Sequence, residues 1–132
     1  MKVQDVIETN ACFLHEEDTI LHASKFMKEE RIRNLPVVDQ NKKLVGLITL
    51  REIIETMFHN PDQILVRSAM LKQEQVVSVT QDIDLTQAIK IMMENKFGCL
   101  PVIDTKGILI GIISEANLLK VLQKYASLPL KS

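Results

Sequence analysis

The sequence predicts a mixed α/β (α+β) domain in which two tandem copies of one βαββα unit, related by a pseudo-twofold axis, pack as a single body. The segment Leu35–Asp39 reads LPVVD, and Leu100–Asp104 repeats it as LPVID 65 positions later. The same shift relates Leu44–Thr49 to Leu109–Ser114, and a register held this long marks a duplicated unit. The 132 residues are 46% hydrophobic and 25% charged, as in ordinary globular domains.

The register of the repeat continues upstream and sets the expected boundaries. Ala23 and Met27 recur as alanine and methionine at the same shift of 65, but before about position 12 the best shift is 63. Two extra residues in the second copy, near Leu71–Gln75, account for the difference, and a surface connection absorbs such an insertion easily. We expect the first repeat over residues 1–60 and the second over 61–128.

The second copy begins with a short strand and an amphipathic helix. Val76–Val79 is rich in β-branched residues, which strands prefer. Apolar residues then recur at the spacing that lines one face of a helix. They are Leu85, Ala88, Ile89 and Met92. Asp82 or Asp84 can cap the start of this helix.

A β-hairpin and a closing helix complete the second copy. Leu100–Ile103 and Leu109–Ile113 are apolar strands, and the turn between them contains Gly107, which can adopt a positive φ. From Glu115 onward, the spacing of the leucines predicts an amphipathic helix that ends before Pro129.

The first copy repeats this order of elements. A strand around Cys12–Leu14 precedes a helix that carries Ile20, Ala23 and Met27. The hairpin and the closing helix are expected over Leu35–Val38, over Leu44–Thr49, and from Leu50 to the stop at Asn60 and Pro61. Because each unit is too small to bury its sheet alone, we expect the copies to share one core.

The charge balance argues against a nucleic-acid-binding protein. Lys and Arg number 16 and Asp and Glu 17, for a net charge of −1, and no run of like charge forms a basic arm. No apolar run reaches the roughly 18 residues that a membrane span needs, and Met1–Asn10 lacks a signal-peptide core. We therefore predict a cytoplasmic protein with no nucleic-acid or membrane partner.

The sequence contains no pattern typical of an enzyme. The histidines have no partner at metal-ligand spacing, and Glu16–Asp18 are adjacent, which scatters their carboxylates. Cys12 and Cys99, the only cysteines, lack the spacing of a zinc site and are interpreted as small buried apolar residues. We predict no catalytic activity, no metal and no required cofactor.

Taken together, the order of the elements and the two repeated motifs resemble a tandem pair of CBS domains, over roughly residues 1–125. The chain is similar to the stand-alone CBS pairs of bacteria. The resemblance implies a regulatory module that binds an adenine nucleotide or S-adenosylmethionine and commonly associates as a dimer.

Two facing units of this kind leave two clefts where the closing helices begin. The N-terminus of a helix presents free N–H groups and a positive dipole end, which favour phosphate oxygens. Thr49 and Ser114 stand at these two positions. Each hydroxyl can bond a phosphate or ribose oxygen of a ligand, or it can simply act as an N-cap.

The sequence departs from the family pattern at the residue that is implied to hold the ribose. In the family, an aspartate three positions after the Thr or Ser is implied to accept from both ribose hydroxyls. Here those positions hold Glu52 and Asn117. Glu52 keeps a carboxylate one methylene further out, whereas Asn117 loses the charge. We therefore favour the cleft with Glu52 for an adenosine-type ligand.

The resemblance also implies that the residues before each Leu-Pro strand line the ligand. They are Ile32, Arg33 and Asn34 in one copy and Phe97, Gly98 and Cys99 in the other. Arg33 or Arg51 can pair with phosphate in a forked geometry, or can remain a solvated surface arginine. Because Gly98 stands opposite Arg33, the clefts are unequal, and we expect one ligand per chain.

The adenine base has its own candidate contacts. Phe97 or Ile32 can cover its face, and backbone groups near Cys12 and Val77 can read its edge. For Ile32, Cys12 and Val77, packing in the core is the alternative interpretation.

We thus predict a ligand-sensing module that binds AMP, ADP, ATP or S-adenosylmethionine between its repeats and transmits this to a partner protein. We expect a homodimer, formed through the helices that begin near Leu50 and Glu115 or through those that begin near Thr19 and Asp84. The alternative is an interaction scaffold that dimerises without binding a nucleotide.

Overall fold

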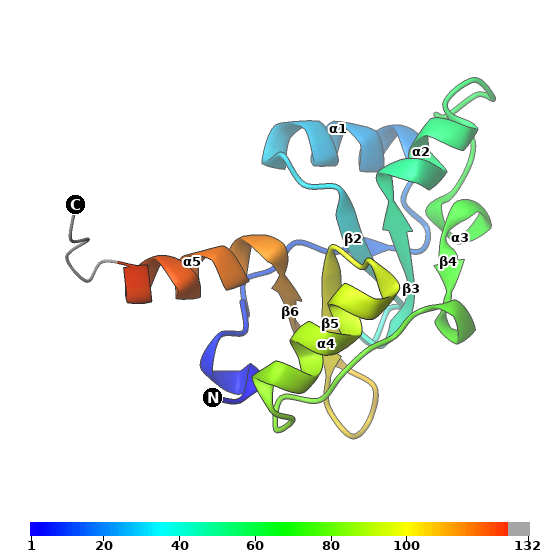
Figure 1. Ribbon diagram of the computed structural model, residues 1–132. Helices are drawn as coiled ribbons and strands as arrows, with labels where there is room; N and C mark the ends of the chain where they lie inside the picture. Colours follow the sequence, from blue (N-terminus) through cyan, green and yellow to red (C-terminus); the bar gives the residue numbers. More distant parts are fainter. Residues whose placement is uncertain (127–132) are drawn as a thin grey trace, which may run out of the picture.

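The computed structural model describes residues 1–126 of the chain (Figure 1). The first half contains η1 (Val3–Asp5), β1 (Leu14–His15), α1 (Ile20–Glu30), β2 (Asn34–Val38), β3 (Leu44–Thr49) and α2 (Leu50–Thr56). The second half contains α3 (Val66–Ala69), β4 (Leu71–Lys72), η2 (Gln73–Gln75), α4 (Leu85–Asn95), β5 (Cys99–Ile103), β6 (Leu109–Ser114) and α5 (Glu115–Ala126). The predicted end of the closing helix before Pro129 lies outside the described residues.

Each repeat forms the same small mixed sheet. In the first, β1 runs parallel to β2, and β2, β3 and β4 are antiparallel neighbours. In the second, β5 and β6 form an antiparallel pair, and single bridges extend it at both edges, from Val79 to Val102 and from Glu8 to Ile112. The predicted strand Val76–Val79 is therefore wrong in length. It pairs only at Val79, and Val76 and Val77 form no strand.

The N-terminal segment of each repeat packs on the other repeat. Val3, at the start of the chain, is fully buried in the core of the second repeat, and its N–H donates to the carbonyl of Ile83 over 3.0 Å. Val66, at the start of α3, is buried in the core of the first repeat, and its N–H donates to the carbonyl of Asp18 over 2.7 Å. This exchange ties the two repeats together.

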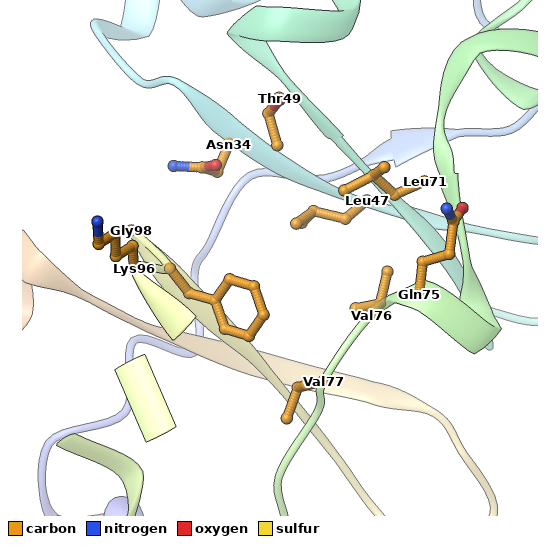
Figure 2. Close-up of a pocket in the computed structure, with 10 residues that line it drawn as sticks. Asn34, Leu47, Thr49, Leu71, Gln75, Val76, Val77, Lys96 and Gly98 are labelled. Carbon is orange, nitrogen blue, oxygen red and sulfur yellow. The ribbon is translucent and has the colours of Figure 1, made fainter. Parts of the chain in front are cut away.

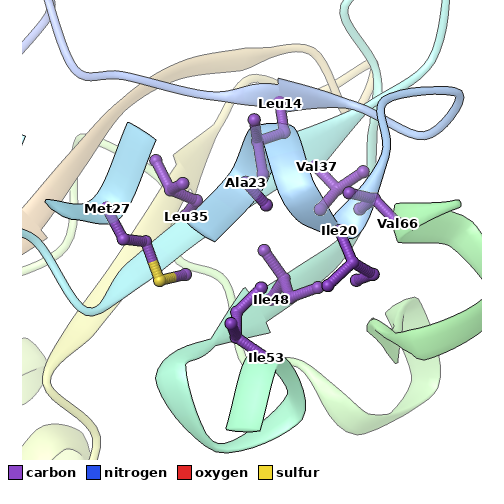
Figure 3. Packing of buried hydrophobic residues seen from close by; sticks show 9 residues of the cluster. All are labelled: Leu14, Ile20, Ala23, Met27, Leu35, Val37, Ile48, Ile53 and Val66. Carbon is purple, nitrogen blue, oxygen red and sulfur yellow. The ribbon is translucent and has the colours of Figure 1, made fainter. Parts of the chain in front are cut away.

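The interior consists of two main apolar clusters rather than the one shared core expected from the sequence. The first cluster, shown in Figure 3, contains residues of β1, α1, β2, β3, α2 and α3. The second cluster contains Val3, Val79, Ala88, Met92, Leu100, Val102 and Ile113. A third, smaller cluster around Val38, Leu44 and Leu109 joins them near the hairpin turns. Each sheet therefore has its own packed face, completed by the partner repeat.

The two hairpin turns meet at the pseudo-twofold axis. The N–H of Leu44 donates to the carbonyl of Gly107 over 3.0 Å, and the N–H of Leu109 donates to the carbonyl of Lys42 over 2.9 Å. The shift of 65 relates Leu44 to Leu109 and Lys42 to Gly107, so the two hydrogen bonds are equivalent. Gly107 has a φ of 84°, as predicted, and Lys42 occupies the equivalent left-handed position with a φ of 64°.

The long helices α1 and α4 begin and end in the same way. The Thr19 side chain caps α1 by accepting from the N–H of His22, and the Asp84 side chain caps α4 by accepting from the N–H of Thr86. Of the two predicted caps for α4, Asp84 is the one used. Each helix ends at a left-handed residue, Arg31 or Lys96, and the chain turns there toward the next strand.

Candidate functional site

A cavity of about 230 Å³ lies between the two repeats (Figure 2). The first repeat contributes the start of β2 and the end of β3, and the second contributes the segment around η2 and the turn between α4 and β5. The lining residues are Asn34, Leu47, Thr49, Leu71, Gln75, Val76, Val77, Lys96, Phe97 and Gly98. Residues from both halves of the chain are thus required to form it.

The local structure explains how these residues come together. Asn34 and Thr49 are register partners at the open end of the β2–β3 hairpin, so both side chains reach the same wall. On the opposite side, the left-handed conformation of Lys96 turns the chain from α4 toward β5 and brings Phe97 and Gly98 to the cavity.

The cavity has an apolar interior and a polar rim. Leu47, Leu71, Val76, Val77 and Phe97 supply apolar surface. The polar members are Asn34, Thr49, Gln75 and Lys96. Figure 2 places Asn34 and Thr49 on one side of the space and Val76 and Val77 on the other. Such a mixture suits a flat, partly polar ligand.

Five of the thirteen residues predicted from the sequence line this cavity. They are Asn34, Thr49, Val77, Phe97 and Gly98. Gly98 lines the cavity and Arg33 does not. The remaining predicted residues lie elsewhere.

Glu52 belongs to the cleft that the sequence favoured, but it does not line the cavity. Its side chain is 8% exposed, and Oε1 accepts from the N–H and from the hydroxyl of Thr49, each over 2.7 Å. The carboxylate thus forms part of the N-terminal cap of α2.

Ser114 and Asn117 form the equivalent cap at the start of α5. Asn117 Oδ1 accepts from the N–H of Ser114 over 2.9 Å and from its hydroxyl over 2.7 Å. Asn117 Nδ2 donates to Glu8 Oε2 over 3.1 Å. The Ser114 hydroxyl also accepts from the N–H of Asn117 over 3.2 Å, which is the N-cap role that the sequence left open, and Thr49 and Glu52 form a capping box at the start of α2. Of these two hydroxyl residues, only Thr49 lines the cavity.

The two candidate arginines lie away from the cavity. Ile32 and Arg33 line a separate groove between α1 and α2, of about 370 Å³. Arg51 points into solvent and pairs with Glu55 over 3.3 Å. Neither Arg33 nor Arg51 therefore lines the cavity with Thr49.

The cysteines are held in protonated form. Burial raises the pKa of the Cys99 thiol to about 12, and the nearby Glu115 carboxylate adds to the effect. Burial also raises the pKa of Cys12, which packs against the first core, and the carboxylates of Glu30 and Glu8 contribute. Neither thiol is therefore a ready nucleophile near neutral pH.

Sequence reasoning missed five residues of the cavity wall. They are Leu47, Leu71, Gln75, Val76 and Lys96. Gln75 falls in the predicted two-residue insertion of the second copy, and this insertion was the signal available for it. Lys96 corresponds to Arg31 under the shift of 65, but only its left-handed backbone reveals its position at the cavity.

Residues 1–126 contain no group of three or more His, Cys, Asp or Glu side chains arranged to hold a metal ion. Within the same part of the chain, every helix is too short or too polar to cross a lipid bilayer.

Comparison with protein families gives two matches along the chain. The sequence model of the family described as "CBS domain" matches residues 3–59 and again residues 66–124. The two matches correspond to the two structural repeats described above.

Curated proteins with similar sequences include one of comparable length and several longer enzymes. An uncharacterized 17.7 kDa protein of Acidianus ambivalens is 35% identical over 92% of this chain and 73% of its own length. A homoserine O-acetyltransferase of Methanococcus vannielii is 27% identical over 88% of this chain. The chain spans only 24% of that enzyme.

Solved structures share the fold over nearly the whole chain. An acetoin utilization protein from Vibrio cholerae is 27% identical with a TM-score of 0.87, covering 97% of this chain and 94% of that one. CBSX2 from Arabidopsis thaliana, solved in complex with AMP, is 24% identical with a TM-score of 0.83, covering 95% and 98%. The domain pair of protein MJ0100, solved with 5′-methylthioadenosine and S-adenosyl-L-methionine, is 22% identical with a TM-score of 0.81, covering 95% and 98%. The last two likenesses show the fold alone.

Proposed function

This chain belongs to the CBS domain family, and from that premise we propose that it is a regulatory module that senses an adenosine-type ligand. The ligand would be an adenine nucleotide or S-adenosylmethionine, bound in the cavity between the repeats. Its binding would be transmitted to a partner protein. The observation that carries the proposal is the cavity itself, because its walls come from both repeats.

The chemistry of the cavity supports an adenosine-type ligand. The apolar side chains, Phe97 among them, suit the face of a purine, and the amides of Asn34 and Gln75 offer both donors and acceptors to its edge. The Thr49 hydroxyl already donates to Glu52, so toward a ligand its oxygen acts as an acceptor. It therefore fits a ribose hydroxyl better than a phosphate oxygen.

The proposed signal follows from the position of the cavity. A ligand that contacts both walls stabilises one relative angle of the repeats over others, since it binds that arrangement most tightly. Hydrogen bonds between the hairpin turns join the repeats on the pseudo-twofold axis. A change of angle would thus pivot near these turns.

We propose that the chain has no catalytic role of its own, and that the repeats divide between residues 60 and 61, between α2 and α3. Its cysteines are free thiols, as is usual in a reducing compartment, and we propose the cytoplasm as its location.

A thermal-shift series with AMP, ADP, ATP and S-adenosylmethionine tests the proposal. A ligand that binds only the folded state at 100 times its Kd stabilises the protein by about 2.7 kcal/mol, which raises the melting temperature by several degrees. If millimolar concentrations of all four compounds leave the melting temperature unchanged, the chain is an interaction scaffold and the proposal fails.

Replacing Thr49 with alanine is expected to weaken binding of the adenosine-type ligand about fivefold, because one hydrogen bond to the ligand is lost. Ser114→Ala is the matched control, since Ser114 makes the same cap but does not line the cavity. Both variants should lose about 1 kcal/mol of stability through the cap. Isothermal titration calorimetry should find weaker binding only for Thr49→Ala. An equal effect of the two variants would contradict the assignment of the cavity.

We also propose that the chain forms a homodimer through α2 and α5. Exposed large apolar side chains gather on these helices and just after α2, as expected of a surface that another protein covers. They are Leu50, Ile54, Met57, Phe58, Leu119 and Leu122. α4 exposes one such side chain, Met93, and α1 exposes none, so the pattern favours the helices that begin at Leu50 and Glu115.

For the dimer, light scattering should give twice the mass of one chain. Ile54→Glu is expected to yield a monomer, because it places a charge in the apolar contact. Gln87→Glu, on the exposed face of α4, should leave the dimer intact. A wild-type monomer at concentrations of about 100 µM, well above the Kd of an ordinary dimer, would exclude this surface as an interface.

A further inference from the structure

The cavity continues into a groove between α4 and α5. Lys96 and Phe97 line both spaces, and the groove has a volume of about 340 Å³. The other residues that line it are Ile89, Met92, Met93, Glu115 and Leu118. A ligand that fills the cavity can therefore extend past Phe97 along an apolar channel.

The junction between cavity and groove holds one positive and one negative side chain. Glu115 Oε1 lies 3.2 Å from the point that a Cβ on Gly98 would occupy, and Asn34 Nδ2 lies 2.8 Å from the same point. Lys96 lines the same junction. Within residues 1–126, neither Lys96 nor Glu115 takes part in an ion pair. Both side chains can thus form ion pairs with charged groups of a ligand.

The fold itself does not require a carboxylate at this place. In the equivalent groove between α1 and α2, the position of Glu115 is taken by Leu50 and that of Gly98 by Arg33. That groove folds in the same way with Lys28, Arg31 and Arg33 around it and no acidic lining residue. The acid–base pair is therefore a property of the site at Gly98.

Resting on the proposed function, we propose that this site is built for S-adenosylmethionine rather than for an adenine nucleotide. The adenosine moiety occupies the cavity and the methionyl chain runs into the groove. The carboxylate of the ligand faces Lys96 and its ammonium faces Glu115. The site thus complements an α-amino acid zwitterion.

Two further features favour this ligand over a nucleotide. A chain of phosphates in the groove would lie beside the Glu115 carboxylate, which repels it, and against the apolar side chains of Met92 and Leu118, which offer it no hydrogen-bond donors. The methylene groups of methionine suit the same surface. Phe97 stands at the junction, where an aromatic ring attracts a sulfonium cation.

The test compares three ligands that share the adenosine group, namely 5′-methylthioadenosine, S-adenosylmethionine and AMP. By calorimetry, S-adenosylmethionine is expected to bind about tenfold more tightly than 5′-methylthioadenosine, which lacks the amino acid group, and more tightly than AMP. Glu115→Gln should remove most of the tenfold preference and leave the affinity for 5′-methylthioadenosine unchanged.

Glu94→Gln is the matched control. It makes the same change of charge on α4, where Glu94 faces solvent and lies 3.9 Å from Lys90, outside both the cavity and the groove. All three affinities should remain as in the wild type. The melting temperatures of both variants in the absence of ligand should match that of the wild type, which excludes an effect through folding.

Two results would overturn the inference and leave the proposed function standing. One is tighter binding of AMP than of S-adenosylmethionine, and the other is an unchanged affinity for S-adenosylmethionine in Glu115→Gln. Failure of all three compounds to bind the wild-type protein would overturn the proposed function itself, and the inference with it.

Discussion

Replacing Gly111 with alanine is expected to destabilise the fold by about 2 to 3 kcal/mol, the upper part of the range of about 1 to 3 kcal/mol that overpacking of a well-packed interior costs. A Cβ on Gly111 would lie 2.5 Å from the carbonyl oxygen of Glu8 and 2.8 Å from the side chain of Ile7. The N-terminal segment lies antiparallel beside β6 at this point, where Glu8 and Ile112 exchange backbone hydrogen bonds. Since backbone is in the way, the segment would have to move, and Val3 would lose its place in the second core.

Gly98→Ala is the matched control for this effect. The nearest atoms to a Cβ there are Asn34 Nδ2 at 2.8 Å and Glu115 Oε1 at 3.2 Å, and both are ends of side chains that can rotate away. We expect a loss of less than about 1 kcal/mol. Urea unfolding followed by circular dichroism measures both variants. Equal losses of stability in the two variants would show that the pairing of the N-terminal segment with β6 does not require glycine at position 111.

Replacing Gly98 with leucine is expected to abolish binding of the adenosine-type ligand, with an affinity at least about 100-fold lower than that of the wild type. The larger side chain would enter the space between Asn34 and Glu115 and fill the junction of cavity and groove. The fold should remain, because the atoms in contact belong to flexible side chains.

The control for Gly98→Leu is Arg33→Leu, the same final residue at the equivalent position of the other repeat. Arg33 is exposed and lines the groove between α1 and α2, so its replacement should leave both ligand affinity and melting temperature nearly unchanged. Calorimetry with AMP and S-adenosylmethionine compares the two variants. Loss of binding in Arg33→Leu, with binding retained in Gly98→Leu, would place the ligand in the opposite cleft.

The sequence predicted the repeated unit because its signals are local. A strand, a helix face and a hairpin turn each depend on residues within a few positions of one another, and the shift of 65 repeated them. The cap at Asp84 and the positive φ of Gly107 followed from the same local chemistry. Local signals could not predict that the N-terminal segment of each repeat packs on the other repeat, because Val3 and the carbonyl of Ile83 that it contacts lie 80 positions apart.

Local motifs likewise predicted some residues of the candidate site and not others. Asn34, Thr49, Phe97 and Gly98 were found through repeated motifs, and they line the cavity. The position of Glu52 was misjudged, because a carboxylate at the start of a helix can face a ligand or turn back to its own N-cap, and only the folded side chain decides. Spacing along the chain carries no information about that choice.

The sequence by itself determined the duplicated βαββα unit, its register and the family to which the chain belongs. The tertiary structure alone decided which side chains line the cavity between the repeats, and which charges surround it. The physical reason is that a cleft is formed by side chains from segments distant in sequence, whose volumes and charges meet only after the repeats have packed. Glycine at 98 in place of arginine leaves space there, and Lys96 and Glu115 give that space its charge.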